Sequence, residues 1–398
     1  MSNTFKFIAL AVVVEIIIYC FVSKVLSVVL PLVVLSFAVY HVVDYKILRR
    51  SQTKRATTSA DQVKVYTFAN HKGGVGKSTI AFFTVKQFSQ ESDGRNILVL
   101  DFSIFGDLTK LCLGLTPDGK FQRGKELSRT GATIEDALAN CLMPRAWYEF
   151  WRKPFSFMHH IQQLSGVPNK NVYILTNKKQ LEDGYDAAVV PLSDADVSRV
   201  IYQLREGLKR TGKKWLVVAD TDGGEMHGYT QLAIGIADSI IIPLTAGMGA
   251  LHDADRLTRL FSYAERLRRQ GLSKATVDYA VFNMAVSRQN NVPWFGSPFT
   301  PQKDVGDNML AVGQLFDEWQ QSYPDLLRPM SRPFEECFGT IRAGGKDFKA
   351  AAVNPWTGNA GNAQADIELF ARTLLSIVPG TGPQGRRLDA DMQAAAEE

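Results

Sequence analysis

Hydrophobic residues follow two different patterns along this chain. From about residue 63 onward, short apolar runs alternate with segments in which apolar residues recur every three or four positions. This alternation is typical of a parallel sheet whose crossover helices cover both faces, so we predict an α/β fold. The short runs predict buried strands at 65–69, 96–100, 172–175, 215–219, 238–243 and 278–283. The longer segments predict helices at 77–90, 195–210, 250–269 and 308–321.

The first part of the chain has a different character, because residues 5–43 are almost continuously apolar. As one helix this stretch would be about 58 Å long at ~1.5 Å per residue, against a bilayer core of about 30 Å. Two spans, at about 5–22 and 26–43 with a tight turn at Ser23-Lys24, fit that thickness better. We therefore predict an N-terminal transmembrane helical hairpin within a membrane anchor at residues 1–50.

Three alternatives to the hairpin stay open. A single tilted span at 26–43 with an amphipathic first segment is favoured by Glu15, because a carboxylate within the bilayer is costly. A buried hairpin in a protein core is the second. A cleaved signal peptide is the third, although no small-residue cleavage site follows the apolar core.

Charge is concentrated around this anchor. Residues 1–60 carry seven Lys or Arg and two acidic residues, which leaves 38 basic and 38 acidic residues in the remainder. A near-neutral remainder argues against general DNA binding, which depends on Lys and Arg neutralising phosphates. A basic cluster next to an apolar segment predicts a cytoplasmic end, and both termini of a hairpin would then be cytoplasmic. The cluster comprises Lys46, Arg49, Arg50, Lys54 and Arg55.

The strand predicted at 65–69 leads directly into a glycine-rich turn and a helix, in the run VYTFANHKGGVGKST. Glycines let backbone N–H groups turn inward to cradle phosphates, and a helix N-terminus adds partial positive charge. In this arrangement Lys77 reaches β- and γ-phosphates, Ser78 ligates Mg²⁺ and Thr79 contacts a phosphate. The sequence therefore predicts an ATP and Mg²⁺ site whose backbone cradle is Gly73, Gly74, Val75 and Gly76.

Polar residues end three of the other predicted strands, where ligands of such sheets bind. Asp101 ends the second strand, Asp220 ends the strand WLVVA, and Asn283 ends the last one. An aspartate after an apolar strand is the arrangement that holds Mg²⁺ in P-loop enzymes, so Asp220 is the predicted metal partner of Ser78. Four widely spaced cysteines, without a Cys-x-x-Cys pair, predict a reducing compartment and no metal cluster.

The run KGGVGKST resembles the deviant Walker A motif of the ParA/MinD family of ATPases, and residues 63–378 follow that family's order of motifs. The resemblance implies that Lys72 crosses a nucleotide-sandwich homodimer to touch the partner's ATP, and that Asn283 contacts adenine. It also implies that Asp101 begins switch I, where Ser103 stands at the position of a second aspartate that places the attacking water. A serine is not an anionic base. Hydrolysis is then slow, or is assisted by Asp107 or Asp222.

The resulting expectation is a membrane-anchored ATPase that acts as an ATP-dependent dimerisation switch, with Lys72, Lys77, Asp101 and Asp222 as catalytic residues. It would position or regulate an envelope assembly at the bacterial inner membrane, through a protein partner; nucleic acid is not favoured. The alternatives are an ATP-locked scaffold with little turnover and, less favoured, a bacterial tyrosine kinase of the polysaccharide type. That kinase group has a tyrosine-rich tail, and this chain has no tyrosine after Tyr323.

Four further segments have weaker assignments. Residues 51–62 read as a polar linker and 379–398 as a disordered tail. Residues 290–360 read as a long excursion that adapts the domain to a partner. Residues 113–170 contain an aromatic and basic stretch that favours an amphipathic helix packed on the domain or a partner, over nucleic acid or membrane. That stretch comprises Trp147, Tyr148, Phe150, Trp151, Arg152, Lys153, Phe155 and Phe157.

Overall fold

The structure is a computed structural model, which separates into two compact units at Met1–Thr58 and Ser59–Glu398. In the second unit it describes residues 62–91, 94–103, 106–114, 133–142, 157–164, 167–176, 192–222, 228–245, 254–285, 303–327, 338–342, 356 and 362–376. In the first unit it describes seven residues, Tyr19, Val22, Ser23, Ser27, Val29, Pro31 and Leu35.

All seven described residues of the first unit are helical, including Ser23, where we expected the turn of a hairpin. Four large apolar side chains among them are exposed: Tyr19 (76%), Val22 (47%), Val29 (49%) and Leu35 (60%). Within the described part of the chain, no helix has the length and apolar character that a bilayer crossing needs. The rest of the predicted hairpin lies outside the described residues, so the hairpin stays a prediction.

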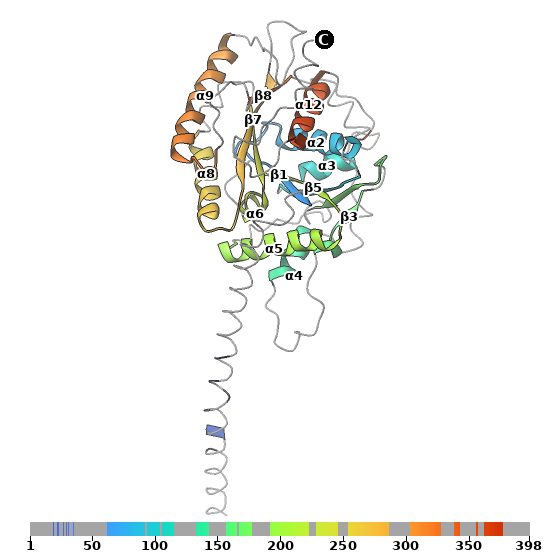
Figure 1. The fold of residues 1–398 in the computed structure, drawn as a ribbon, viewed down its shortest axis with the longest axis vertical. Coiled ribbons are helices and arrows are strands. Elements are labelled where there is room, and N and C mark those ends of the chain that lie inside the picture. The colour runs from blue at the N-terminus through green and yellow to red at the C-terminus, as the bar shows by residue number, and fades with distance from the viewer. Residues whose placement is uncertain are drawn as a thin grey trace, which may run out of the picture. The chain divides into compact units, whose positions relative to one another are not determined.

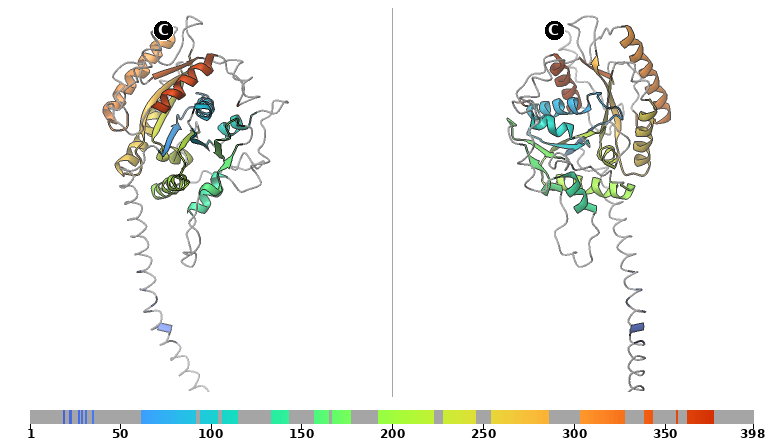
Figure 2. Two further views of the ribbon diagram at one scale, coloured as in Figure 1. Left: turned by 45° about the vertical axis from the view of Figure 1, so that its right-hand side comes forward. Right: turned by 180° about the vertical axis from the view of Figure 1, so that it is seen from behind.

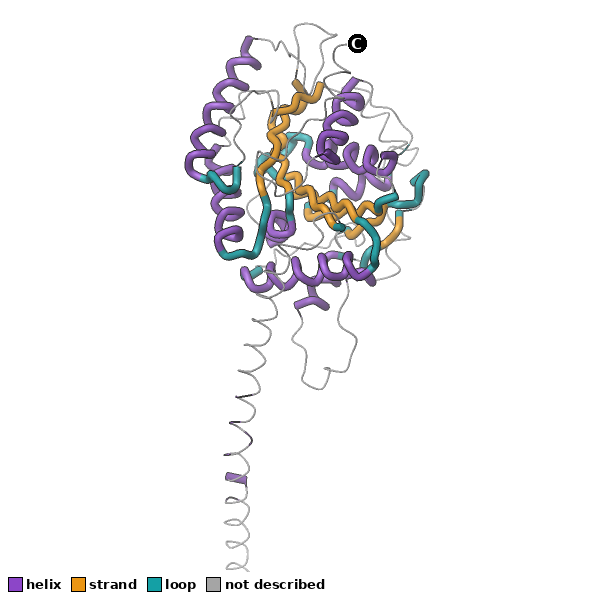
Figure 3. Tube along the Cα trace, viewed as in Figure 1, coloured by secondary structure: helices purple, strands orange, loops and turns teal. Residues whose placement is uncertain are grey.

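The second unit is built on one sheet, with the strand order β3-β4-β2-β5-β1-β6-β7-β8. The described strands pair in parallel, except that β3 pairs antiparallel with β4. Figure 3 shows the strands (orange) gathered in one sheet between helices (purple). The strands are β1 (Val63–Phe68), β2 (Asn96–Phe102), β3 (Gln162–Gln163), β4 (Val172–Leu175), β5 (Trp215–Thr221), β6 (Ser239–Thr245), β7 (Thr276–Ala285) and β8 (Phe338–Arg342). The six predicted strands are confirmed, and the sequence reading missed β3 and β8.

Helices cover both faces of this sheet, as the alternating pattern predicted (Figures 1 and 2). They are α2 (Lys77–Glu91), α3 (Asp107–Leu113), α4 (Ile134–Leu142), α5 (Asp194–Arg210), α6 (Gly228–Ile236), α8 (Ala254–Arg269), α9 (Lys303–Ser322) and α12 (Asn362–Ser376). A short 3-10 turn occupies Phe157–His159. The four predicted helices are confirmed, with ends that differ by a few residues.

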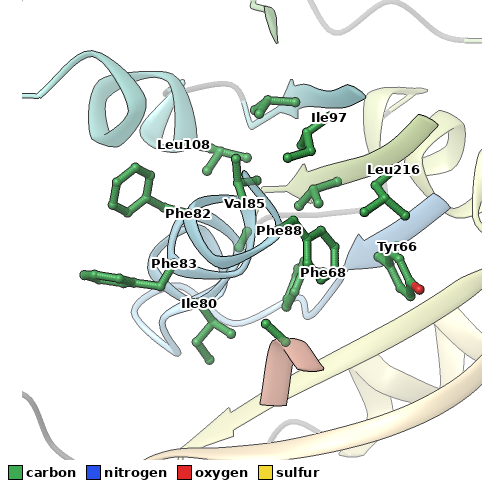
Figure 4. Close-up of a cluster of buried hydrophobic side chains, with 14 of the residues drawn as sticks. Tyr66, Phe68, Ile80, Phe82, Phe83, Val85, Phe88, Ile97, Leu108 and Leu216 are labelled. Carbon is green, nitrogen blue, oxygen red and sulfur yellow. The ribbon is translucent and has the colours of Figure 1, made fainter. Parts of the chain in front are cut away.

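The helices α2, α3 and α12 pack on one face of the sheet. Alternate residues of β1 point to this face, where Tyr66 and Phe68 meet the apolar side of α2 (Figure 4). Phe88 of α2 lies 5.6 Å from Tyr66 between ring centroids, and Phe370 of α12 lies 6.4 Å from Phe68. This packing holds α2, which begins at Lys77, against the strand that precedes it in the chain.

The opposite face is covered by α4, α5 and α6 over one half of the sheet and by α8 and α9 over the other. Phe261 of α8 meets Phe316 and Trp319 of α9, with ring centroids 6.1 Å and 5.2 Å away. The excursion predicted at 290–360 therefore contributes α9 to the core and β8 to the sheet. Cys112 and Cys141 are buried free thiols; the other two cysteines lie outside the described residues.

Two helix ends have side-chain partners. Ser193 caps α5 by accepting from the backbone of Asp196, whose carboxylate accepts from the backbone of Ser193 in return, which is a capping box. Two basic residues at the end of α8 lie at the surface and pair with carboxylates of α5 and of α8 itself. Arg266 pairs with Asp194 at 3.1 Å and Arg269 with Glu265 at 2.9 Å.

Candidate nucleotide and magnesium site

The predicted site residues converge at the carboxyl edge of the sheet because the central strands are parallel. Asp101 at the end of β2 is in register with Asp220 at the end of β5. On the neighbouring strand, Phe68 of β1 is in register with Asp220, and the chain continues from Phe68 into the glycine-rich turn. Asn283 of β7 is in register with Thr245 of β6. Segments more than 200 residues apart in the sequence thus meet at one edge.

The turn before α2 is held by side chains of its own. Asn70, buried at 2% exposure, donates from Nδ2 to the carbonyl of Pro243 at 2.7 Å and accepts the N–H of Lys72 at Oδ1, 2.9 Å away. The ammonium of Lys77 donates to the carbonyl of Lys72 at 2.9 Å. Lys77 therefore curls back over the turn, at the place where phosphate oxygens bind in a P-loop.

The end of the turn is held from β7. Asn283, 5% exposed, donates from Nδ2 to the carbonyl of Val75 at 3.0 Å. Gly76 has a φ of +87°, and Asn283 Nδ2 occupies the position that a Cβ on Gly76 would take. A residue other than glycine is excluded there twice, by backbone conformation and by space. The predicted contact of Asn283 with adenine stays a prediction; the structure gives this side chain a second task in bracing the turn.

Lys77 sits among carboxylates. Burial lowers the pKa of the Lys77 ammonium, and the negative charges of Asp220, Asp222 and Asp107 oppose that shift. A buried lysine beside three carboxylates stays cationic more readily than one without them. A cation held in this way is suited to a phosphate, since it arrives already partly desolvated.

Asp220 has the features of a metal ligand. It is fully buried, and neither carboxylate oxygen has a hydrogen bond of good geometry among the described residues. Burial first, and then the charge of Asp101, raise the pKa of Asp220 well above its usual range; the Ser78 hydroxyl, as a nearby hydrogen-bond donor, and the charge of Lys77 oppose this shift. A buried carboxylate with so little hydrogen bonding is costly. A divalent cation between Ser78 and Asp220 would remove that cost, so these residues fit Mg²⁺.

The carboxylate of Asp101, unlike that of Asp220, accepts hydrogen bonds of good geometry at both oxygens. Its Oδ2 accepts from the backbone N–H of Thr109 at 2.7 Å and from the Thr109 hydroxyl at 2.6 Å, while Oδ1 accepts from the N–H of Ser103 at 3.2 Å. Burial raises the pKa of Asp101 to about 6, against the lowering effect of these bonds. The Thr109 hydroxyl also bonds that of Thr176 at 2.7 Å. Asp101 thus organises the start of α3, which is a positioning role.

The residues predicted to place water lie on the rim of this site. Ser103 is buried at 3% exposure, and its carbonyl accepts from Gly106 at 3.0 Å in the turn before α3. Asp107 begins α3 and pairs with Lys110 at 3.0 Å on the surface. Asp222 is half-buried just beyond the end of β5. The charges of Asp107 and Asp222 both act on Lys77, so these two carboxylates face the same site.

The sequence reading missed two contributors. Asn70 precedes the motif, and nothing in its local pattern announces a bond to β6. Thr109 lies two residues into α3, and its bonds to Asp101 depend on how α3 turns after Gly106, which has a φ of 60°. In the sequence, the signal for that turn was a glycine at position 106 directly before an aspartate, because glycine readily adopts a left-handed conformation.

Comparisons with known proteins agree with this geometry at the level of the fold. An ATP complex of a McdA variant from Cyanothece matches with a TM-score of 0.51 at 17% identity, covering 80% of this chain and 98% of that one. A ParA family ATPase from Chlorobium tepidum gives 0.46 at 15% identity, covering 79% and 100%. Cobyrinic acid a,c-diamide synthase from Mycobacterium smegmatis, with bound ADP and magnesium, gives 0.41 at 16%, covering 65% and 96%.

No model of a protein family matches the sequence, and no curated protein matches it. The fold match is nevertheless specific about architecture. The domain shares its fold with that McdA variant, and the glycine-rich turn, Asp101 and Asp220 lie together at the carboxyl edge of the sheet, where ligands of such sheets bind.

Proposed function

We propose that this chain, whose large domain has the ParA-type fold, is a ParA/MinD-like ATPase that binds ATP with Mg²⁺ at residues 72–79. The observation that carries the proposal is the burial of two charged groups, Lys77 and Asp220, near the glycine-rich turn. One is a buried cation on the first residue of α2, and the other is a buried carboxylate without a good donor among the described residues. Each group is costly alone, and a magnesium nucleotide satisfies both.

Within this site the residues have separate tasks. The backbone N–H groups from Gly73 to Gly76 surround the phosphates, Lys77 neutralises them and Thr79 adds a hydroxyl. Mg²⁺ is held between Ser78 and Asp220 and stabilises the charge that builds up on the transferred phosphate. Asn283 lies next to the turn, where an amide reads an adenine edge, which favours ATP over GTP.

The proposed output is a nucleotide-dependent homodimer. Two domains close face to face over two ATP molecules, and Lys72 of each reaches across to the other nucleotide. Only the dimer gains these contacts, so ATP shifts the equilibrium toward it and hydrolysis releases it. Lys72 lies at the open side of the turn, between two glycines that are exposed and a buried histidine. This makes the protein a switch rather than a metabolic enzyme.

The first unit supplies the proposed location. Tyr19, Val22, Val29 and Leu35 are exposed apolar residues of a helical segment within the apolar run 5–43. Exposed apolar residues at this density need a bilayer or a partner. We place the chain at the bacterial inner membrane with the ATPase in the cytoplasm, where it positions or regulates an envelope assembly through a protein partner. Conjugation, secretion or polysaccharide export are the kinds of apparatus that fit.

A second candidate is an ATP-locked scaffold with little turnover, favoured by Ser103. Its backbone carbonyl and N–H are engaged with Gly106 and Asp101, and a hydroxyl stands where a carboxylate would be expected. Asp107 and Asp222 are the two carboxylates that face the site and can replace it.

The proposal is tested on the full chain purified in detergent, with ATP hydrolysis and the mass of the particle measured together. Lys77→Ala should abolish ATP binding and hydrolysis, while Lys209→Ala, a surface lysine that pairs with Glu206, should leave both unchanged. Turnover by the wild type supports the switch. ATP-dependent dimers with negligible turnover, raised by Ser103→Asp, support the scaffold. Absence of ATP binding by the wild type would overturn the proposed function.

A further inference from the structure

The peptide of Lys72 is held from both sides. Its N–H donates to Asn70 Oδ1 at 2.9 Å, and its carbonyl accepts from the Lys77 ammonium at 2.9 Å. Asn70 is itself fixed, because its Nδ2 donates to the Pro243 carbonyl on β6 at 2.7 Å. The buried side chain of Asn70 therefore ties the backbone of Lys72 to β6, the strand that pairs with β1.

These two bonds have different fates when a nucleotide binds. Lys77 is the group assigned to the phosphates, so phosphate oxygens compete with the Lys72 carbonyl for its ammonium. The hydrogen bonds of Asn70 involve neither the Lys77 ammonium nor the backbone N–H groups from Gly73 to Gly76, which are the groups assigned to the phosphates. We therefore expect these bonds to persist when a nucleotide binds. After Lys77 has moved to the nucleotide, the Asn70 side chain still joins the backbone of Lys72 to the sheet.

We propose that Asn70 is a positioning residue that sets the backbone of Lys72, so that the Lys72 side chain reaches the nucleotide of the partner protomer. This inference rests on the proposed nucleotide-sandwich dimer and deepens it. A lysine side chain is long and flexible, and a small error in its backbone direction is multiplied at the ammonium. A side-chain bond from residue i to the N–H of residue i+2 fixes that direction locally.

A buried asparagine that only joined β1 to β6 would have other consequences. Its loss would lower stability and weaken ATP binding, independently of Lys72. A positioning residue instead acts through Lys72, so its removal has no further effect once the Lys72 side chain is gone. The two roles are separated by a double-mutant cycle on ATP-dependent dimerisation.

The experiment compares wild type, Asn70→Ala, Lys72→Ala and the double variant as full chains in detergent. ATP affinity is measured with Mg²⁺-ATP by calorimetry, dimerisation by chromatography with light scattering, and stability by the melting midpoint. Asn70→Ala should weaken ATP-dependent dimerisation about tenfold or more, with a much smaller change in ATP affinity. The double variant should dimerise no more weakly than Lys72→Ala alone.

Two further variants separate positioning from folding. Asn70→Ser keeps a side-chain oxygen that can accept from Lys72 N–H but lacks the amide for Pro243, and it should recover much of the dimerisation lost in Asn70→Ala. Thr67→Val removes another buried bond from β1, from Oγ1 to the Ala233 carbonyl at 2.8 Å. It should lower the melting midpoint and leave dimerisation unchanged, which makes it the structural control.

The inference is overturned if the effects of Asn70→Ala and Lys72→Ala add, or if Asn70→Ala dimerises like the wild type. Should Asn70→Ala fail to fold, Asn70→Leu, which keeps the shape of the side chain and loses both hydrogen bonds, carries the same cycle. If Lys72→Ala binds ATP and dimerises as the wild type does, the sandwich role of Lys72 is wrong. That result removes the proposed dimer itself, and it is distinct from a failure confined to Asn70.

Discussion

Asn283 and Gly76 lie in direct contact in the fold, although most of the domain separates them in the sequence. The Asn283 amide nitrogen occupies the position that a Cβ on Gly76 would take, and it donates to the neighbouring Val75 carbonyl at 3.0 Å. Gly76 also has a φ of +87°. The last turn before α2 is therefore held by β7 as well as by its own glycines.

Gly76→Ala should abolish ATP binding. It should also destabilise the domain by more than the backbone strain alone would cost, because the added Cβ meets Asn283. Gly94→Ala is the matched control, since Gly94 has a φ of +75° and a Cβ added there would meet no atom within 4 Å. We expect the control to cost about 1–2 kcal/mol, the strain of a left-handed residue. Urea denaturation and ATP calorimetry measure both effects.

The excess cost of Gly76→Ala should fall when Asn283 is shortened. In an Asn283→Ala background, Gly76→Ala loses the steric conflict and retains only the backbone strain. Equal costs for Gly76→Ala in both backgrounds would show that Asn283 does not confine the turn. This comparison uses stability as its readout, because Asn283→Ala is expected to weaken nucleotide binding on its own.

Asp220→Asn should stabilise the nucleotide-free domain and abolish Mg²⁺-dependent activity. The carboxylate is fully buried without a good donor among the described residues, so a neutral amide of the same shape removes a buried charge. Active sites commonly give up stability for function in this way. A melting scan in a chelator should show a higher midpoint at neutral pH than that of the wild type, and ATP hydrolysis should be lost.

Asp101→Asn is the contrasting variant on the neighbouring strand. Asp101 accepts three hydrogen bonds, from the Ser103 backbone and from the backbone and hydroxyl of Thr109. An amide cannot accept at both of its ends, so this variant should lower stability by about 1–3 kcal/mol. A rise in the melting midpoint for Asp101→Asn as well would mean that general charge relief, and not the missing donor at Asp220, explains the first result.

Stability without Mg²⁺ should fall as the pH rises from about 4 to about 6. Burial raises the pKa of Asp101 to about 6 in the folded state, above the value of about 3.9 in an unfolded chain. Between these two pKa values the folded state binds more protons than the unfolded state. The stability contributed by protonated Asp101 is therefore complete below about pH 4 and is lost as the pH rises past about 6. The loss is about 3 kcal/mol at most. Urea midpoints measured in a chelator between pH 4 and 7 test it; a midpoint that rises across this window would contradict the assignment.

Trp356 links the chain after β8 to the site. Its indole Nε1 donates to the Cys112 carbonyl at the end of α3 at 3.0 Å, and its ring lies 5.6 Å from Phe82 of α2. Trp356→Ala should cost about 3–5 kcal/mol. Trp356→Phe keeps a ring but leaves the Cys112 carbonyl without this donor, at about 1–3 kcal/mol. Denaturant titration measures both.

The two helices that Trp356 touches carry Lys77 and Thr109, so its loss should also weaken ATP binding. Trp319→Phe is the control, since Trp319 donates to the Thr258 hydroxyl at 3.1 Å between α8 and α9, on the other face of the sheet. It should lower stability and leave ATP affinity unchanged. Equal effects of Trp319→Phe and Trp356→Phe on ATP affinity would rule out a specific link from Trp356 to the site.

Elements with a strong local pattern were predictable. The apolar runs predicted all six central strands, and the run KGGVGKST predicted the turn and the helix after it. Asp220 and Asp101 were found because a parallel sheet collects strand ends at one edge. The edge strands β3 and β8 have little apolar periodicity, and they become strands only by pairing with β4 and β7.

By itself the sequence predicted six of the strands, four of the helices and the residues that we propose for a magnesium nucleotide, because these follow from the order of neighbouring residues. Only the tertiary structure decided which distant groups hold that chemistry in place. Asn70 bonds a carbonyl 173 residues away, Asn283 bonds one 208 residues away, and Trp356 bonds one 244 residues away. The physical reason is that a buried polar group must find a partner wherever the packed chain places one, and no local pattern records that partner.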